Sequence, residues 1–131
     1  MKPLEGKSVI LTGAGGGIGR PTALVLAAAG ARVVVSDIHA GNLEQTLDQV
    51  RGAGGEAIAV RADITREDDV RALVQAAAAA FGTVDALVNN CGNSLHRDRD
   101  IVSMDVDTWD ATMALNARAP MLCCKHAIPV M

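Results

Sequence analysis

Short apolar runs alternate along the chain with longer stretches in which apolar residues recur every three or four positions. The short runs lie at residues 8–11, 32–36, 57–60 and 86–89, and each is typical of a buried β-strand. The intervening stretches have the period of amphipathic helices. Strands that alternate with helices form βαβ units with right-handed crossovers and a parallel sheet. The pattern therefore predicts a doubly wound α/β fold.

The ends of the expected helices carry local signals. The first helix spans about residues 18–29, and the second stops at the glycine-rich segment 52–55. The third begins at Thr65, a good N-cap residue that acidic residues follow, and it ends at Gly82. A final helix is expected after a long loop over residues 92–106. Loops of that length inside a compact domain are usually functional or disordered.

A glycine-rich turn over residues 12–19 joins the first strand to the first helix. A strand, a glycine turn and a helix N-terminus together form an anion site, because free N–H groups and the helix dipole attract a pyrophosphate. Gly13, Gly17 and Gly19 give the spacing G-x-x-x-G-x-G after a threonine, which is neither the common dinucleotide fingerprint nor a P-loop. A glycine turn without a ligand is the alternative interpretation.

Three later segments, together with this turn, resemble motifs of the short-chain dehydrogenase/reductase family. The segments are Asp63-Ile64, Asn89-Asn90-Cys91-Gly92 and Met113-Ala114-Leu115-Asn116. The first is similar to the family's acidic–aliphatic pair that contacts adenine. The second is similar to its Asn-Asn-Ala-Gly motif, with a cysteine in place of alanine, and the third to the segment with the catalytic asparagine. The resemblance covers about residues 6–131 and implies a Rossmann-like sheet with strand order 3-2-1-4.

The resemblance also implies a nicotinamide cofactor, and two positions favour NAD, with NADP less expected. Asp37 lies 18 residues after Gly19, at the end of the second strand. A carboxylate there can accept hydrogen bonds from ribose hydroxyls and would repel the additional phosphate of NADP. NADP-preferring relatives tend to carry a basic residue where this chain has Gly16. His39 would blur the preference if it became charged, and a turn or capping role is the alternative for Asp37.

The expected cofactor-binding residues come from the glycine turn and from the carboxyl ends of strands, where ligands bind in such sheets. They are Gly13, Gly15, Gly16, Gly17, Ile18, Gly19, Asp37, Ile38, Asp63, Ile64, Asn90 and Gly92. Asp63 could instead cap the turn that follows it. Asn116 shares a helical face with Trp109 and Met113, and the resemblance implies that it is catalytic. A hydrogen-bonded amide in the core is the alternative for Asn116.

The family's serine and its Tyr-x-x-x-Lys pair have no counterpart in this sequence, which contains no tyrosine. We therefore expect residues 1–131 to be a single NAD-binding half-domain, truncated after the helix that follows strand four and without the catalytic half. By resemblance the whole enzyme would transfer a hydride between NAD and a secondary alcohol or ketone. The alternative is a truncated nucleotide-binding module that is not catalytic. The fourth strand would be an open sheet edge. This predicts either that association into a homo-oligomer covers the edge or that the rest of the protein was removed after folding.

Composition and charge exclude several other classes. The net charge is −3 without a basic tract, so no nucleic-acid surface is expected. There is no apolar run near the ~20 residues of a membrane span and no signal peptide, so a cytoplasmic protein is expected. The three cysteines form no disulfide framework. Cys123, Cys124 and His126 suggest a metal site, but successive helical positions diverge, so none is expected.

Overall fold

The computed structural model describes residues 1–94 and 99–131, and its sheet has the expected topology. Four parallel strands lie in the order β3-β2-β1-β4. The elements are β1 (Ser8–Thr12), α1 (Gly19–Ala28), β2 (Arg32–Asp37), α2 (Ala40–Gly52), β3 (Glu56–Arg61), α3 (Glu67–Phe81), β4 (Ala86–Val88), α4 (Val106–Met113), the π-helical turn Ala114–Arg118, α5 (Ala119–Ala127) and the 3-10 turn Ile128–Val130. The prediction of a doubly wound α/β fold is confirmed.

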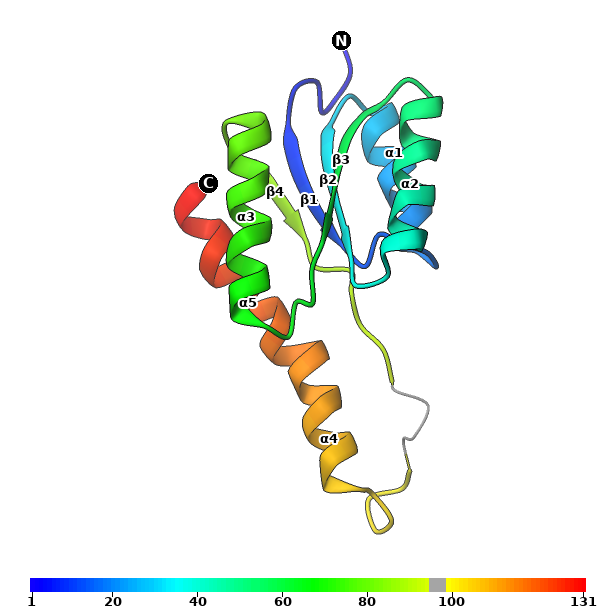
Figure 1. The fold of residues 1–131 in the computed structure, drawn as a ribbon, viewed down its shortest axis with the longest axis vertical. Helices are drawn as coiled ribbons and strands as arrows, with labels where there is room; N and C mark the ends of the chain where they lie inside the picture. The colour runs from blue at the N-terminus through cyan, green and yellow to red at the C-terminus, as the bar shows by residue number, and fades with distance from the viewer. Residues whose placement is uncertain (95–98) are drawn as a thin grey trace.

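Helices cover both faces of the sheet (Figure 1). On one face, Val9 and Leu11 of β1 pack in a core cluster with residues of α1 and α2. On the other face, Ile10 packs with residues of α3 and with Ala127 of α5. Successive strand residues point to opposite faces, so a strand buried on both sides must be apolar throughout. This explains why the strands appear as continuous apolar runs in the sequence.

The third helix begins later than the sequence predicts. Its first residue is Glu67 and its N-cap position is Arg66, so the prediction of Thr65 as the N-cap is wrong. The Thr65 hydroxyl instead donates to Asp63 Oδ1 at 2.6 Å, within a turn that precedes the helix. Short polar side chains form hydrogen bonds with nearby groups in turns as well as at helix caps. Here the Thr65 side chain stabilises the turn and does not cap the helix.

The last helical segment is continuous from α4 through the π-helical turn to α5. Figure 1 shows α5 beside α3, whereas α4 extends beyond the carboxyl edge of the sheet. Trp109 and Met113 of α4 are accordingly 51% and 44% exposed, so they do not form the buried stripe that their spacing suggested. None of the helices in the described ranges combines the length and the apolar composition that a membrane span requires.

Candidate functional site

A cavity of about 650 Å³ lies at the carboxyl edge of the sheet, and most of the predicted site residues line it. These are Gly13, Gly15, Gly16, Gly17, Ile18, Asp37, Ile38, Asp63, Asn90 and Gly92. Ile64 is buried and lines an adjoining cavity of about 70 Å³ together with Asp63. Gly19 and Asn116 line neither cavity. Segments far apart in the sequence therefore meet at one place.

The glycine turn requires glycine at two positions for steric reasons. Gly13 has φ of +65°, and a Cβ there would lie 2.9 Å from Cys91 Cα. A Cβ on Gly19 would overlap the carbonyl oxygen of Gly13. Gly19 is thus needed for the close approach of α1 to β1 and is buried behind the turn.

Three backbone amides of the turn have no acceptor among the described residues. They belong to Gly16, Gly17 and Ile18, directly before α1. Unpaired N–H groups at a helix N-terminus attract anions, because the helix dipole adds to their partial charge. The turn can therefore hold a phosphate or pyrophosphate.

The Asp37 carboxylate at the end of β2 is fixed by two backbone amides. Its Oδ2 accepts from the Gly15 N–H at 2.9 Å, and its Oδ1 accepts from the His39 N–H at 2.9 Å. A Cβ on Gly15 would lie 2.8 Å from Asp37 Cγ, so these two residues pack directly against each other. Each carboxylate oxygen can accept more than one hydrogen bond, so Asp37 can still bind ligand hydroxyls.

Asn90 joins the end of β4 to the end of the neighbouring strand β1. Its Nδ2 donates to the carbonyl oxygens of Thr12 and Gly13, both at 3.1 Å. The Thr12 hydroxyl accepts from the N–H groups of Asn90 and Cys91, both at 3.2 Å. The Asn90 side-chain oxygen has no hydrogen bond to the described residues. Burial raises the pKa of the neighbouring Cys91 thiol, with smaller contributions from the charges of Asp37 and Asp63.

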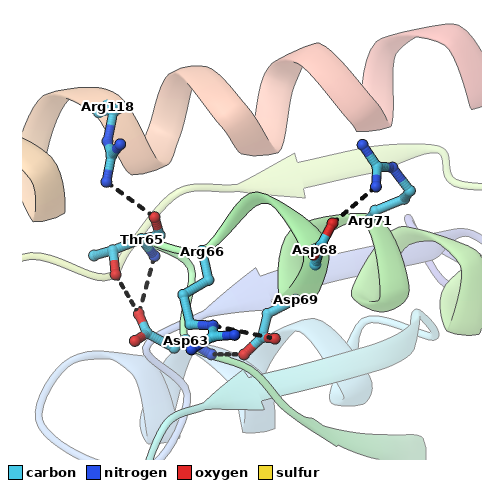
Figure 2. A network of polar contacts seen from close by, with 7 residues as sticks. All are labelled: Asp63, Thr65, Arg66, Asp68, Asp69, Arg71 and Arg118. Atoms are coloured by element: carbon cyan, nitrogen blue, oxygen red, sulfur yellow. Dashed lines mark hydrogen bonds and ion pairs between the residues drawn. The ribbon is translucent and has the colours of Figure 1, made fainter.

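Asp63 lies in the polar network that Figure 2 shows between β3 and α3. Its Oδ1 accepts from the Thr65 N–H at 3.0 Å as well as from the Thr65 hydroxyl. The Asp63 N–H donates to Asp69 Oδ2 at 2.9 Å, and Arg118 donates to the Thr65 carbonyl at 3.1 Å. Asp63 therefore caps the turn, the alternative that the sequence left open. Its Oδ2 has no partner among the described residues, and the residue lines the cavity.

Asn116 lies in the π-helical turn and fixes the start of the loop after β4. Its Oδ1 accepts from the Asn93 N–H at 3.1 Å, and its Nδ2 donates to the carbonyl oxygens of Asn93 and Thr112 at 2.8 and 2.9 Å. A Cβ on Gly92 would lie 2.7 Å from Asn116 Oδ1, so the contact depends on glycine there. Asn116 is exposed, and the interpretation of it as a core amide is wrong.

Several residues that line the cavity are not among the predicted site residues. They are His39, Asn42, Thr65, Cys91, Asn93, Ala111 and Leu115. Most of them lie within a few residues of a predicted site residue, so the motifs locate them approximately. Ala111 and Leu115 are four residues apart on the helix that follows the long loop, and this spacing puts both on one face. The charged residues 96–98 of that loop lie outside the described residues.

The residues suggested as metal ligands have other roles. Burial raises the pKa of Cys123 to about 11, and the Asn89 side-chain amide contacts Cys124 Sγ at 3.5 Å. His126 Nε2 lies 2.8 Å from Glu67 Oε1. Residues 1–94 and 99–131 contain no group of three or more His, Cys, Asp or Glu that could hold a metal ion.

Comparison with known proteins supports the resemblance found in the motifs. The uncharacterized oxidoreductase YxbG of Bacillus subtilis strain 168 is 38% identical over 131 residues, which cover 100% of this chain and 48% of that protein. The 7alpha-hydroxysteroid dehydrogenase of Escherichia coli K12 is 45% identical over 102 residues, which cover 78% of this chain and 40% of that protein. The chain thus spans about half the length of the curated relatives it matches.

Solved structures show the same relationship. A short-chain dehydrogenase/reductase from Burkholderia phymatum, crystallised in complex with NAD, has a TM-score of 0.93 at 34% identity. The match covers 100% of this chain and 46% of that one. The protein-family model described as short chain dehydrogenase matches residues 7–131 of this chain. The chain therefore belongs to the short-chain dehydrogenase family.

Proposed function

We propose that this chain is the NAD-binding half of an oxidoreductase that transfers a hydride between NAD and a secondary alcohol or ketone. The observation that carries the proposal is the convergence of the free amides at Gly16, Gly17 and Ile18 with the Asp37 carboxylate on one cavity. An anion site beside a carboxylate matches a dinucleotide, whose pyrophosphate lies next to a ribose with two free hydroxyls.

The cavity residues fit such a cofactor. A Cβ on Gly16 or Gly17 would meet open space, so nothing in the protein blocks a phosphate there. The three free amides would hold the pyrophosphate, and Asp37 would accept hydrogen bonds from the adenosine ribose. Asp63 and Ile64 would border the adenine, and the free oxygen of Asn90 would face the nicotinamide ribose.

When bound, the nicotinamide ring supplies the hydride chemistry, and the protein contributes binding and orientation. Asn116 is proposed as the catalytic residue of this half. Through Asn93 it fixes the backbone that continues from Gly92 along the cavity wall. Its present partners are backbone groups only, so a role in proton transfer would require residues beyond this chain.

We also propose a substrate class, a cellular location and an oligomeric state for the whole enzyme. An alcohol or ketone would be the substrate, and a cytoplasmic location would suit an enzyme that draws on soluble NAD. Association into a homo-oligomer is supported by exposed apolar side chains of Trp109, Met113, Met121 and Ile128 along the last helical segment.

Titration calorimetry of the purified chain with NAD tests the proposal directly. We expect saturable binding with one site per chain. An absence of binding at millimolar NAD, in protein shown to be folded by circular dichroism, would contradict it. The alternative, a nucleotide-binding module without catalysis, is favoured by the lack of tyrosine in the sequence and shares this binding result. The titration therefore tests the nucleotide site that both candidates share, and neither candidate predicts turnover by residues 1–131 alone.

A further inference from the structure

Two side chains outside the cavity hold consecutive carbonyl groups of the glycine turn. The Thr46 hydroxyl on α2 donates to the carbonyl oxygen of Ala14 at 2.8 Å. Arg20, in the first turn of α1, donates from Nη2 to the carbonyl oxygen of Gly15 at 2.5 Å. Arg20 Nε also donates to Thr46 Oγ1 at 3.0 Å, so the two side chains form one unit. Neither residue lines the cavity.

This unit is anchored firmly on α2. Thr46 is fully buried. Arg20 Nη2 additionally donates to the carbonyl oxygen of Asn42 and to Gln45 Oε1, both at 3.2 Å. A guanidinium presents its donors in a rigid planar fork, so Nε reaches Thr46 while Nη2 reaches its three acceptors, two of which share one hydrogen. A lysine ammonium carries the same charge but cannot span them.

The geometry of the peptide bond links these contacts to the cavity. In a trans peptide the N–H points away from the C=O of the same unit. When Thr46 binds the Ala14 carbonyl, the Gly15 N–H points the opposite way, and there it donates to Asp37. When Arg20 binds the Gly15 carbonyl, the Gly16 N–H is likewise turned away from α2. Gly16 lines the cavity, and its N–H has no acceptor among the described residues.

We propose that Arg20 and Thr46 are positioning residues for the cofactor. Arg20 orients the Gly16 N–H toward the phosphate. Thr46 fixes the Gly15 N–H, which in turn holds the Asp37 carboxylate toward the ribose. This inference rests on the proposed function, because it assumes that a nucleotide occupies the cavity. It assigns a binding role to two side chains that do not touch the ligand.

The test compares nucleotides with and without phosphate by NMR titration of ¹⁵N-labelled protein. For Arg20→Lys we expect the affinity for ADP to fall about tenfold, which corresponds to one charge-assisted hydrogen bond between the Gly16 N–H and the phosphate. The affinity for adenosine should stay the same. The ¹⁵N shift of Gly16 should change in the free variant. Arg51→Lys is the matched control, since Arg51 ties α2 to the Ala57 carbonyl at 3.0 Å, outside the cavity lining.

Thr46 gives a second, independent pair of variants. Thr46→Ser keeps the hydroxyl and should bind NAD as the unchanged protein does. Thr46→Val removes the hydroxyl at nearly constant shape, so it should weaken NAD binding and reduce the preference for NAD over NADP. A purely structural role would lower the unfolding temperature without changing that preference.

The outcomes separate the two proposals. If the unchanged protein binds neither NAD nor ADP, the proposed function fails. If it binds them and Arg20→Lys loses ADP and adenosine equally, or neither, the positioning role of Arg20 is wrong. If Thr46→Val keeps the NAD preference of Thr46→Ser, the role of Thr46 is wrong. If Arg20→Lys does not fold, the Thr46 pair still tests whether this unit positions the turn for the cofactor.

Discussion

At the residue scale, the Asp37 carboxylate is the group expected to discriminate between NAD and NADP. Backbone amides of Gly15 and His39 hold it in place at the cavity, so it cannot easily turn away from an additional phosphate. We expect the unchanged protein to bind NAD at least about tenfold more tightly than NADP, or about 1.4 kcal/mol. Asp37→Ala should remove most of that difference in calorimetric titrations.

Asp48→Ala is a suitable control for the Asp37 variant, because Asp48 is a carboxylate on α2 that does not line the cavity. It should leave both affinities unchanged. Equal binding of NAD and NADP by the unchanged protein would refute the role of Asp37.

The glycine turn allows a test in which backbone strain is matched. Gly17 and Gly54 both have positive φ, of +52° and +82°, and a Cβ on either would meet no protein atom within 4 Å. Valine at either position is therefore strained by the backbone alone. Gly17→Val should abolish NAD binding, because the side chain enters the space of the pyrophosphate, whereas Gly54→Val should bind normally. Circular dichroism checks that both variants keep their secondary structure, and NAD binding by Gly17→Val would place the phosphate elsewhere.

Candidate site residues could be predicted from the sequence where a short motif contains them. Gly13 and Asp37 were predicted because glycines after the first strand and a carboxylate after the second are typical of a nucleotide site. Arg20 and Thr46 could not be identified, since their acceptors are carbonyl groups whose direction is defined only when α1 and α2 pack together. The turn-capping contact of Asp63 was left open because its partner Thr65 is equally suited to capping a helix.

At the scale of elements, Glu67 connects α3 to α5. Its Oε1 accepts from Lys125 Nζ at 2.6 Å and lies 2.8 Å from His126 Nε2. These two hydrogen bonds lower the pKa of Glu67 from 4.5 to about 2. The folded pKa is the lower one, so the stabilisation is complete above pH 4.5 and is lost as the pH falls toward 2.

The unfolding temperature between about pH 2 and pH 6 measures this contribution. The difference between the unchanged protein and Glu67→Gln should be largest above pH 4.5 and should disappear near pH 2. Asp68→Asn is the control, because Asp68 is the next residue and its exposed carboxylate pairs only with Arg71, within α3, among the described residues. A pH-independent difference for Glu67→Gln would show that its ionisation does not connect the helices.

Helices and strands could be predicted from the sequence where their buried residues form a regular apolar pattern. All four strands follow from short continuous apolar runs, because they are buried on both faces of the sheet. The first three helices follow from apolar residues at helical spacing, because each packs one face against the sheet. The π-helical turn could not be predicted, since it coincides with hydrogen bonds from Asn116 to Asn93, a residue in a different segment. The exposure of Trp109 could not be predicted either, because helical periodicity marks a face without showing whether another layer covers it.

At the scale of the whole molecule, we expect these 131 residues alone to have no measurable dehydrogenase activity. The sequence contains no tyrosine, so the family's proton donor is absent from these residues. General acid–base catalysis typically contributes ~10²–10⁴-fold to the rate. The measurement is NADH formation from a panel of secondary alcohols, on protein whose intact mass is verified. Turnover by such protein would refute the expectation.

The pairing of β1 with β4 has a consequence for the order of folding. The hydrogen bond from the Asn90 N–H to Thr12 Oγ1 joins residues 78 positions apart, whereas β1 and β2 are connected by a single helix. Contacts that close long loops cost more chain entropy, and they tend to form slowly. The β1–α1–β2 unit should therefore assemble first, and β4 should join the sheet late. Because Asn90 and Gly92 arrive with β4, the nucleotide cavity would be among the last parts of the molecule to form, and NAD binding should appear in the slowest phase of refolding.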